Sequence, residues 1–141
     1  MVGFFAGGSS DAFLTKLNDS GDCLWATYFG GQGEDRGTDI ALNKLTNSVY
    51  IAGVTNSNSG LSTIGVYQDT LGGDYDAFLT RFDTSGMMVW STEDGGSGSE
   101  GAGLMAGTGS DKKGNIYLCG VTMSDENMAT IGSYQLQGAG K

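Results

Sequence analysis

A stretch of 21 residues near the start of this chain recurs later in the same chain. Residues 11–31 read DAFLTKLNDSGDCLWATYFGG, and residues 76–96, which lie 65 positions further on, read DAFLTRFDTSGMMVWSTEDGG. Aligned without gaps, 11 of the 21 positions are identical, and Trp25 and Trp90 fall at the same place. A copy at a fixed period is typical of repeat architectures, in which each unit packs against its neighbours. The sequence therefore predicts two related structural units.

Composition and local pattern favour an all-β fold. Gly accounts for 26 of the 141 residues and Pro for none, which indicates many tight turns. No helix-period apolar pattern occurs, whereas short segments rich in β-branched and aromatic residues are common. Each copy is expected to form one four-stranded antiparallel unit, the first over residues 1–75 and the second over residues 76–141. The strands expected in the first copy are residues 12–17, 24–29, 39–42 and 49–54.

The connections repeat as well as the strands. The segment Asn18-Asp19-Ser20-Gly21 and its copy Asp83-Thr84-Ser85-Gly86 combine short polar residues with Gly, which is typical of hairpin turns. The long connection at residues 56–75 carries Ile64-Gly65 and Tyr67-Gln68, which return as Ile131-Gly132 and Tyr134-Gln135. Because structureless loops of this length are uncommon in compact domains, the repeated connection is predicted to be packed.

These motifs together resemble the SBBP β-propeller repeat family. The pattern is GG-x-x-DAFLT-K/R, then W-x-T-x-x-GG, then Y-I/L-x-G-V-T, then IG-x-YQ, and it covers nearly the whole chain. The resemblance implies a propeller of four-stranded blades and a secreted or cell-surface bacterial setting. It implies no known activity. The second copy departs from the first where Tyr28-Phe29 becomes Glu93-Asp94 and where GEDRGTDIAL, residues 33–42, becomes GSEGAGLMAG, residues 98–107. These changes make the third strand of the second copy the least certain element.

Two blades cannot close a propeller by themselves. Each blade buries its faces only against neighbouring blades, and at least about three repeats are needed for stability. The ring is therefore expected to be completed either by other copies of this chain or by the rest of a longer parent chain. Three identical chains would give a ring of six blades and four would give eight. The expected partners are other propeller blades.

The charge excludes one class of partner. With 16 acidic and 7 basic residues, the net charge is −9, whereas nucleic-acid binding depends on Lys and Arg that neutralise phosphate. No apolar run approaches the roughly 20 residues that a membrane helix needs, and no signal peptide is recognised at the start. A protein or glycan partner stays open. Cys23 and Cys119 align with apolar positions of the other copy and are predicted to be small core residues.

Candidate catalytic groups are few. The chain contains no His, which excludes catalysis by Ser-His-Asp or Cys-His arrangements. Paired carboxylates could still support glycoside hydrolysis, and the closest cluster is Glu34, Asp35 and Asp39, matched in the second copy by Glu93, Asp94 and Glu100. A solvated acidic loop is the favoured interpretation. Calcium binding at Glu34, Asp35 and Asp39 is a weaker hypothesis, because the spacing does not match an EF-hand loop. No cofactor is expected.

Aromatic residues give the remaining candidates. Trp25 and Trp90 could stack on sugars, but their position in a strand favours a packed blade core. Tyr67, Gln68, Tyr134 and Gln135 lie on the long connections, where binding residues tend to concentrate. They are the predicted ligand-binding residues, although packing between blades is the more favoured role.

The sequence thus predicts a non-enzymatic β-propeller module that acts as a binding or structural scaffold in a cell-surface or extracellular assembly. Two alternatives stay open. One is an oligomeric, lectin-like carbohydrate-binding propeller that uses the loop aromatics, and the other is a carboxylate-based glycoside hydrolase.

Overall fold

The computed structural model describes residues 6–101 and 106–138, and within these ranges the chain contains strands and no helix. None of the described residues belongs to a helix that could cross a membrane. All pairings between the named strands are antiparallel. The all-β prediction is confirmed. The strands are β1 (Ala12–Leu17), β2 (Cys23–Phe29), β3 (Asp35–Asn43), β4 (Ser48–Thr55), β5 (Asp76–Asp83), β6 (Met88–Asp94), β7 (Ala106–Ser110) and β8 (Ile116–Gly120).

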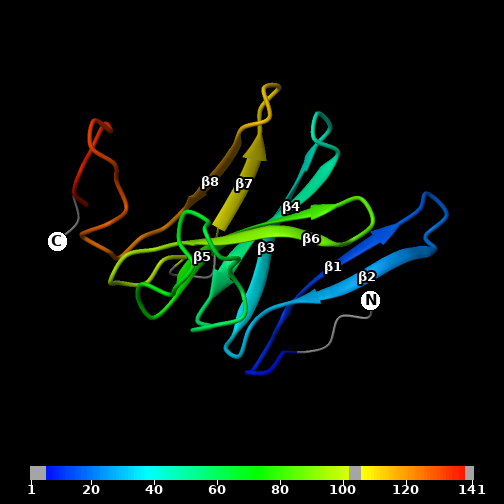
Figure 1. The fold of residues 1–141 in the computed structure, drawn as a ribbon, viewed down its shortest axis with the longest axis horizontal. Coiled ribbons are helices and arrows are strands. Elements are labelled where there is room, and N and C mark those ends of the chain that lie inside the picture. The colour runs from blue at the N-terminus through cyan, green and yellow to red at the C-terminus, as the bar shows by residue number, and fades with distance from the viewer. Residues whose placement is uncertain (1–5, 102–105, 139–141) are drawn as a thin grey trace.

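The strands group into three sheets, and the grouping differs from the expected one. The central sheet has the order β3-β4-β5-β6, while β1-β2 and β7-β8 form two-stranded sheets (Figure 1). The expectation that each sequence copy forms its own four-stranded unit is therefore corrected. A sequence period fixes the length of the repeat but not which strands pair. Here Thr55 and Asp76 are cross-strand partners, so the long connection closes a wide hairpin across the boundary between the copies.

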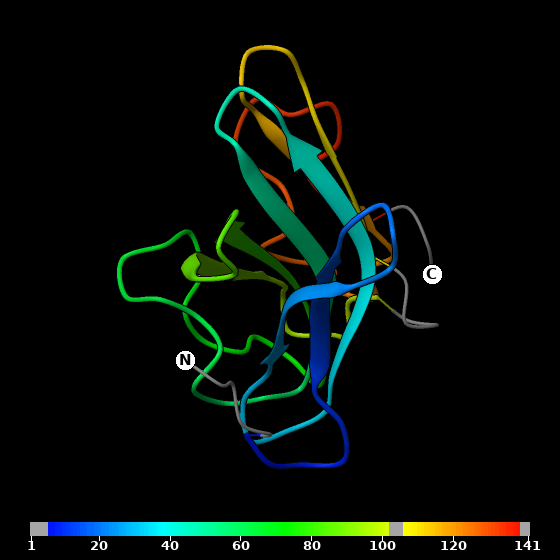
Figure 2. The same cartoon turned by 90° about the vertical axis from the view of Figure 1, so that its right-hand side faces the viewer.

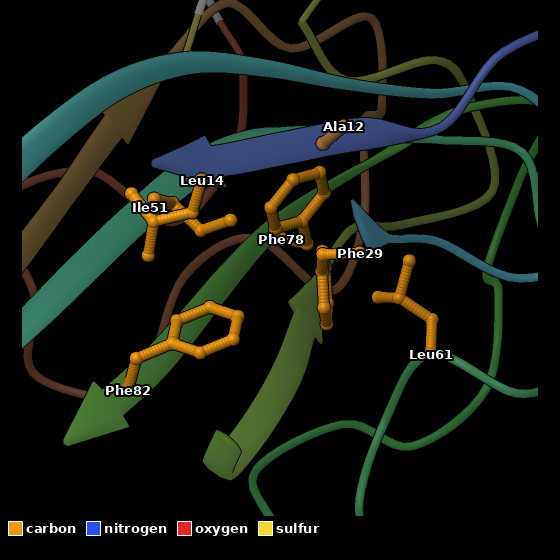
Figure 3. Close-up of a cluster of buried hydrophobic side chains, with 7 residues drawn as sticks. All are labelled: Ala12, Leu14, Phe29, Ile51, Leu61, Phe78 and Phe82. Atoms are coloured by element: carbon orange, nitrogen blue, oxygen red, sulfur yellow. The ribbon is translucent and has the colours of Figure 1, made fainter. Parts of the chain in front are cut away.

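One face of the central sheet packs against β1 and β2. The buried side chains of this first cluster, drawn in Figure 3, come from β1, β2, β4, β5 and the connection after β4. Phe29 is the centre of the aromatic contacts, with ring centroids 5.2 Å from Phe78 and 5.9 Å from Phe82. The members are Ala12, Leu14, Phe29, Ile51, Leu61, Phe78 and Phe82.

The opposite face of the central sheet packs against β7 and β8. Because side chains alternate between the faces of a strand, Tyr50 and Ala52 of β4 point away from the first cluster and join a second one. That cluster includes Ala106 of β7, with Ile116 and Leu118 of β8 packed against it. Both faces of the central sheet are thus covered by two-stranded sheets of the same chain.

The connection from β4 to β5 is packed only in part, and its counterpart in the second copy is not packed: Ile64 and Ile131 are 99% and 100% exposed, and residues 129–138 are all exposed. The path of the connection from β4 to β5, green in Figure 2, follows strand β6: the amide of Thr63 donates to the carbonyl of Ser91 at 2.9 Å, and the amide of Glu93 donates to the carbonyl of Gln68 at 3.0 Å. Leu61 in the same connection is 1% exposed. The connection therefore covers the outer edge of the central sheet.

The predicted hairpin turns are confirmed, and a third turn repeats them. Gly21, Gly86 and Gly114 have φ values of 87°, 86° and 95°, a region that Gly adopts without strain. Each turn starts with a side-chain oxygen that accepts backbone amides two and four residues ahead, supplied by Asn18, Asp83 and Asp111. These bonds account for the preference for Asn or Asp at this position.

The prediction for the cysteines is wrong for this chain. Cys23 and Cys119 are free and exposed. Cys119 lies on β8, and its counterpart Ala52 on β4 is 0% exposed because β5 lies beside it. Strand β8 has only β7 as a neighbour, so Cys119 is left open.

Replacing Gly53 with alanine is expected to destabilise the fold by about 2 kcal/mol. A Cβ atom at Gly53 would meet the carbonyl oxygen of Arg36 and would lie 2.5 Å from the ring of Phe78, which is 0% exposed and cannot move aside. Gly109→Ala is the matched control, since nothing lies within 4 Å of its Cβ position on β7. Urea unfolding should separate the two variants; equal stabilities would contradict the packing described here.

Candidate functional site

The acidic cluster predicted around Asp35 is split by the fold. Asp35 is 0% exposed and lies at the start of β3. Its carboxylate accepts hydrogen bonds from the hydroxyl of Thr55 at 2.5 Å, the hydroxyl of Ser57 at 2.8 Å and the amide of Gly31 at 2.8 Å. Three donors from two segments therefore meet on one carboxylate, and Asp35 serves as a clamp between β3 and the end of β4.

The two neighbours of Asp35 in the predicted cluster bind other partners. Glu34 accepts the phenolic hydrogen bond of Tyr75 at 2.7 Å and pairs with Arg36. The Tyr75 bond, followed by the Arg36 bond, lowers the pKa of Glu34, and the same contact raises the pKa of Tyr75. Asp39 accepts the amide of Thr108 at 2.7 Å. Among the described residues no group of three or more His, Cys, Asp or Glu side chains could hold a metal ion.

The second copy repeats the clamp with a longer side chain. Glu100 is 2% exposed, and its carboxylate accepts the hydroxyls of Thr122 at 2.8 Å and Ser124 at 2.6 Å and the amide of Gly96 at 3.0 Å. The Thr and Ser partners were not among the predicted site residues. The repeated sequence Val-Thr-x-Ser, at residues 54–57 and 121–124, is the signal that could have found them.

Glu93 is the carboxylate with the most unusual surroundings. It is 2% exposed, its Oε1 accepts the hydroxyl of Ser62 at 2.9 Å, and its Oε2 has no hydrogen-bond partner. Burial, opposed by the Ser62 bond and reinforced by the charges of Asp76 and Asp35, raises the pKa of Glu93 to about 7. Burial and the charge of Glu100 also raise the pKa of Asp94.

The predicted ligand-binding residues of the first copy face different surroundings. Gln68 is held in place: its Nε2 donates to Asp76 at 2.7 Å, and its Oε1 accepts the amide of Gly95 at 3.0 Å. Tyr67, in contrast, is 69% exposed. In the second copy Tyr134 is fully exposed, and Gln135 is exposed too. The two Tyr side chains are therefore accessible, whereas Gln68 joins the connection to β5 and β6.

The two tryptophans occupy equivalent places in their hairpins. Trp25 is the cross-strand partner of Lys16, and Trp90 is the cross-strand partner of Arg81. Both are half-buried and pack against the apolar clusters, Trp25 on the first and Trp90 on the second. Trp90 also meets the ring of Tyr50 edge-on, with centroids 5.8 Å apart. These contacts agree with the packed-core interpretation.

A groove of about 720 Å³ runs between β1 and β3. It is lined by residues 10–15 on one side and by residues 35–40 with Ile51 on the other. Phe13, which is 73% exposed, lines it, so the groove is open along the free edge of β1. Sequence reasoning missed this groove because it depends on which strand edges remain unpaired.

Comparison with known proteins identifies the repeat. The model of the SBBP family, described as a beta-propeller repeat, matches residues 24–60, which run from β2 through β3 and β4 into the following connection. No curated protein matches the chain. The resemblance inferred from the repeated motifs is confirmed for one segment of the chain: residues 24–60 match the model of the SBBP beta-propeller repeat.

Proposed function

We propose that this chain is a non-enzymatic scaffold that presents β-propeller blades for binding within a cell-surface or extracellular assembly. The observation that carries the proposal is that buried carboxylates of the repeat accept hydrogen bonds from hydroxyls of neighbouring segments. Asp35 and Glu100 are buried and fully occupied by Thr, Ser and backbone donors, so they tie strands together. Carboxylates that are buried and hydrogen-bonded in this way stabilise the fold and are not available to a substrate.

The blades of this scaffold complete a ring with further blades. In the chain, one full four-stranded blade lies between two half-blades. Two half-blades together supply one more blade, so each chain contributes two. A ring made only of copies of this chain has six blades with three copies and eight with four, and further repeats of a longer parent chain would complete a ring equally.

The geometry supports a non-enzymatic role over a glycoside hydrolase. Glycosidases need two carboxylates that flank the substrate, about 5–10 Å apart. Asp35 is 0% exposed, and Glu34 is engaged by Tyr75 and Arg36. Incubation with a panel of polysaccharides is expected to give no turnover; turnover that Glu34→Gln abolishes would overturn the proposal.

A lectin-like propeller is the second candidate, and the exposure of Tyr67 and Tyr134 favours it. Exposed aromatic rings on loops offer an apolar face for stacking on sugars. A glycan array separates the candidates. The scaffold proposal predicts no glycan binding above background. The lectin predicts binding that Tyr67→Ala with Tyr134→Ala removes and that Tyr28→Ala, an exposed tyrosine on β2, leaves unchanged.

A further inference from the structure

Within the described residues, β1 and β8 are among the strands that have one unpaired edge. Strand β1 is paired only with β2, and strand β8 is paired only with β7. By the sequence repeat, β1 corresponds to β5 and β8 corresponds to β4. In the central sheet these counterparts pair with each other over eight residues. The chain therefore contains one complete pairing, β4 with β5, and one unpaired copy of each of these two strands, β8 and β1.

Residues on the unpaired strands β1 and β8 are much more exposed than the equivalent residues on the paired strands β5 and β4. Phe13 on β1 is 73% exposed, whereas its counterpart Phe78 on β5 is 0% exposed. Tyr117 on β8 is 59% exposed, whereas its counterpart Tyr50 on β4 is 3% exposed. Long free edges with apolar side chains pair readily with another strand. The same side-chain types are thus buried in one repeat and open in the other.

We infer that β8 of one copy of this chain pairs antiparallel with β1 of a second copy, in the register that β4 and β5 use within the chain. The inference rests on the proposed scaffold and names its partner. The internal partners Tyr50 and Arg81 become Tyr117 of one copy and Lys16 of the next. The two half-blades then form a four-stranded sheet in the order β7-β8-β1-β2.

The groove beside β1 has the position that this arrangement requires. Within the chain, β4 pairs with β5 while its neighbour β3 lies against β7, where the hydroxyl of Thr38 donates to the carbonyl of Ala106 at 2.6 Å. Applied to the next copy, the same relation places an incoming β8 along β1 and an incoming β7 beside β3. The groove between β1 and β3 is the space that these two strands would fill.

A second contact between the repeats gives an independent match. Trp25 donates its indole hydrogen bond to the carbonyl of Thr84 at 3.0 Å, in the hairpin of the second copy. Its ring lies 2.8 Å from the Cβ position of Gly86. The corresponding Gly21 has nothing within 4 Å of its Cβ position. The inferred pairing brings Trp90 of one copy onto Gly21 of the next. The same arrangement therefore covers the exposed hairpin glycine and pairs the free edge of β1.

The pairing is tested by cross-linking a variant with two new cysteines. Lys16→Cys and Tyr117→Cys are combined with Cys23→Ser and Cys119→Ser, so that a disulfide can form only between the new positions. Both new sites are exposed, so the substitutions leave the apolar clusters intact. Directly opposite residues in antiparallel strands lie within disulfide range. Mild oxidation is expected to convert most of the protein into covalently linked oligomers.

The matched control moves one cysteine by a single residue. In Thr15→Cys with Tyr117→Cys the two side chains point to opposite faces of the joined sheet, so linking should be much weaker. Thr15 is exposed, so this control also leaves the apolar clusters intact. Sedimentation of the unmodified chain should give the mass of three or four copies. A monomer in solution, or equal linking in both variants, overturns the inference. Neither cross-linking nor sedimentation involves a ligand. A ring that forms but binds no ligand would therefore contradict the proposed binding role and still support the strand pairing.

Discussion

Replacing Asp35 with alanine is expected to lower the free energy of unfolding by about 3–5 kcal/mol. The side chain is 0% exposed and accepts three hydrogen bonds, from Thr55, Ser57 and the amide of Gly31. Removal leaves these donors buried without an acceptor. Each unsatisfied buried group costs about 1–3 kcal/mol, so the loss exceeds that of an ordinary surface substitution several-fold.

The hydroxyls cannot simply turn to new partners. Thr55 already accepts the amide of Ser57 at 2.9 Å, and Ser57 already accepts the amide of Gly33 at 2.8 Å. Their protons are therefore directed at Asp35. Urea unfolding followed by tryptophan fluorescence measures the effect, because Trp25 packs against the first apolar cluster.

Two further variants make this prediction specific. Asp35→Asn keeps the shape but replaces one accepting oxygen with a donor, so it should lose at least about 1 kcal/mol. Asp19→Ala, which removes an exposed carboxylate in the first hairpin, should stay within about 0.5 kcal/mol of the original chain. If Asp35→Ala were as stable as Asp19→Ala, the clamp would have no role in holding the blade together.

The strand positions could be predicted from the sequence because they depend on local chemistry. The Asn and Asp turns with Gly at a positive φ mark the hairpins, and the expected first strand, residues 12–17, agrees with β1. The third strand is longer than expected, since β3 runs over Asp35–Asn43 and the prediction covers only residues 39–42. The sheet grouping could not be predicted, since the repeat says that two segments are alike without saying which edges meet. The pairing of Thr55 with Asp76 joins residues of different copies that lie about 20 positions apart, so the local sequence does not determine it.

The site was only partly predictable for a similar reason. Asp35 stands out in the sequence as one of several carboxylates in a Gly-rich turn, but its partners Thr55 and Ser57 come from 20 or more residues further on. The sequence predicts Gln68 as a binding residue because it lies on a long connection. The structure shows its amide engaged with Asp76 and Gly95. Exposure and bonding of a loop residue depend on the sheet edge that the loop follows.

The stability of the chain is expected to fall as the pH rises from about 4.5 to about 7, because of Glu93. Burial raises the pKa of this carboxyl from 4.5 to about 7 in the folded chain. Between these values the unfolded chain has released the proton while the folded chain keeps it. The folded state then binds more protons, so stability decreases with pH. The full change is about 3 kcal/mol, since each unit of pKa corresponds to about 1.4 kcal/mol.

Glu93→Gln isolates this contribution, because glutamine keeps the shape of a carboxyl side chain that cannot ionise. The two proteins should have similar pH responses below pH 4.5, and above about pH 7 the variant should be the more stable by up to about 3 kcal/mol. Urea unfolding at half-unit steps of pH measures the difference. Glu126→Gln, at an exposed position, removes the same charge and controls for the net charge of −9. Parallel curves for Glu93→Gln and Glu126→Gln would contradict the burial of an ionisable group on β6 of the central sheet. A difference confined to Glu93→Gln would tie the pH response to the site where the second copy replaces Tyr28 of the first with a carboxylate.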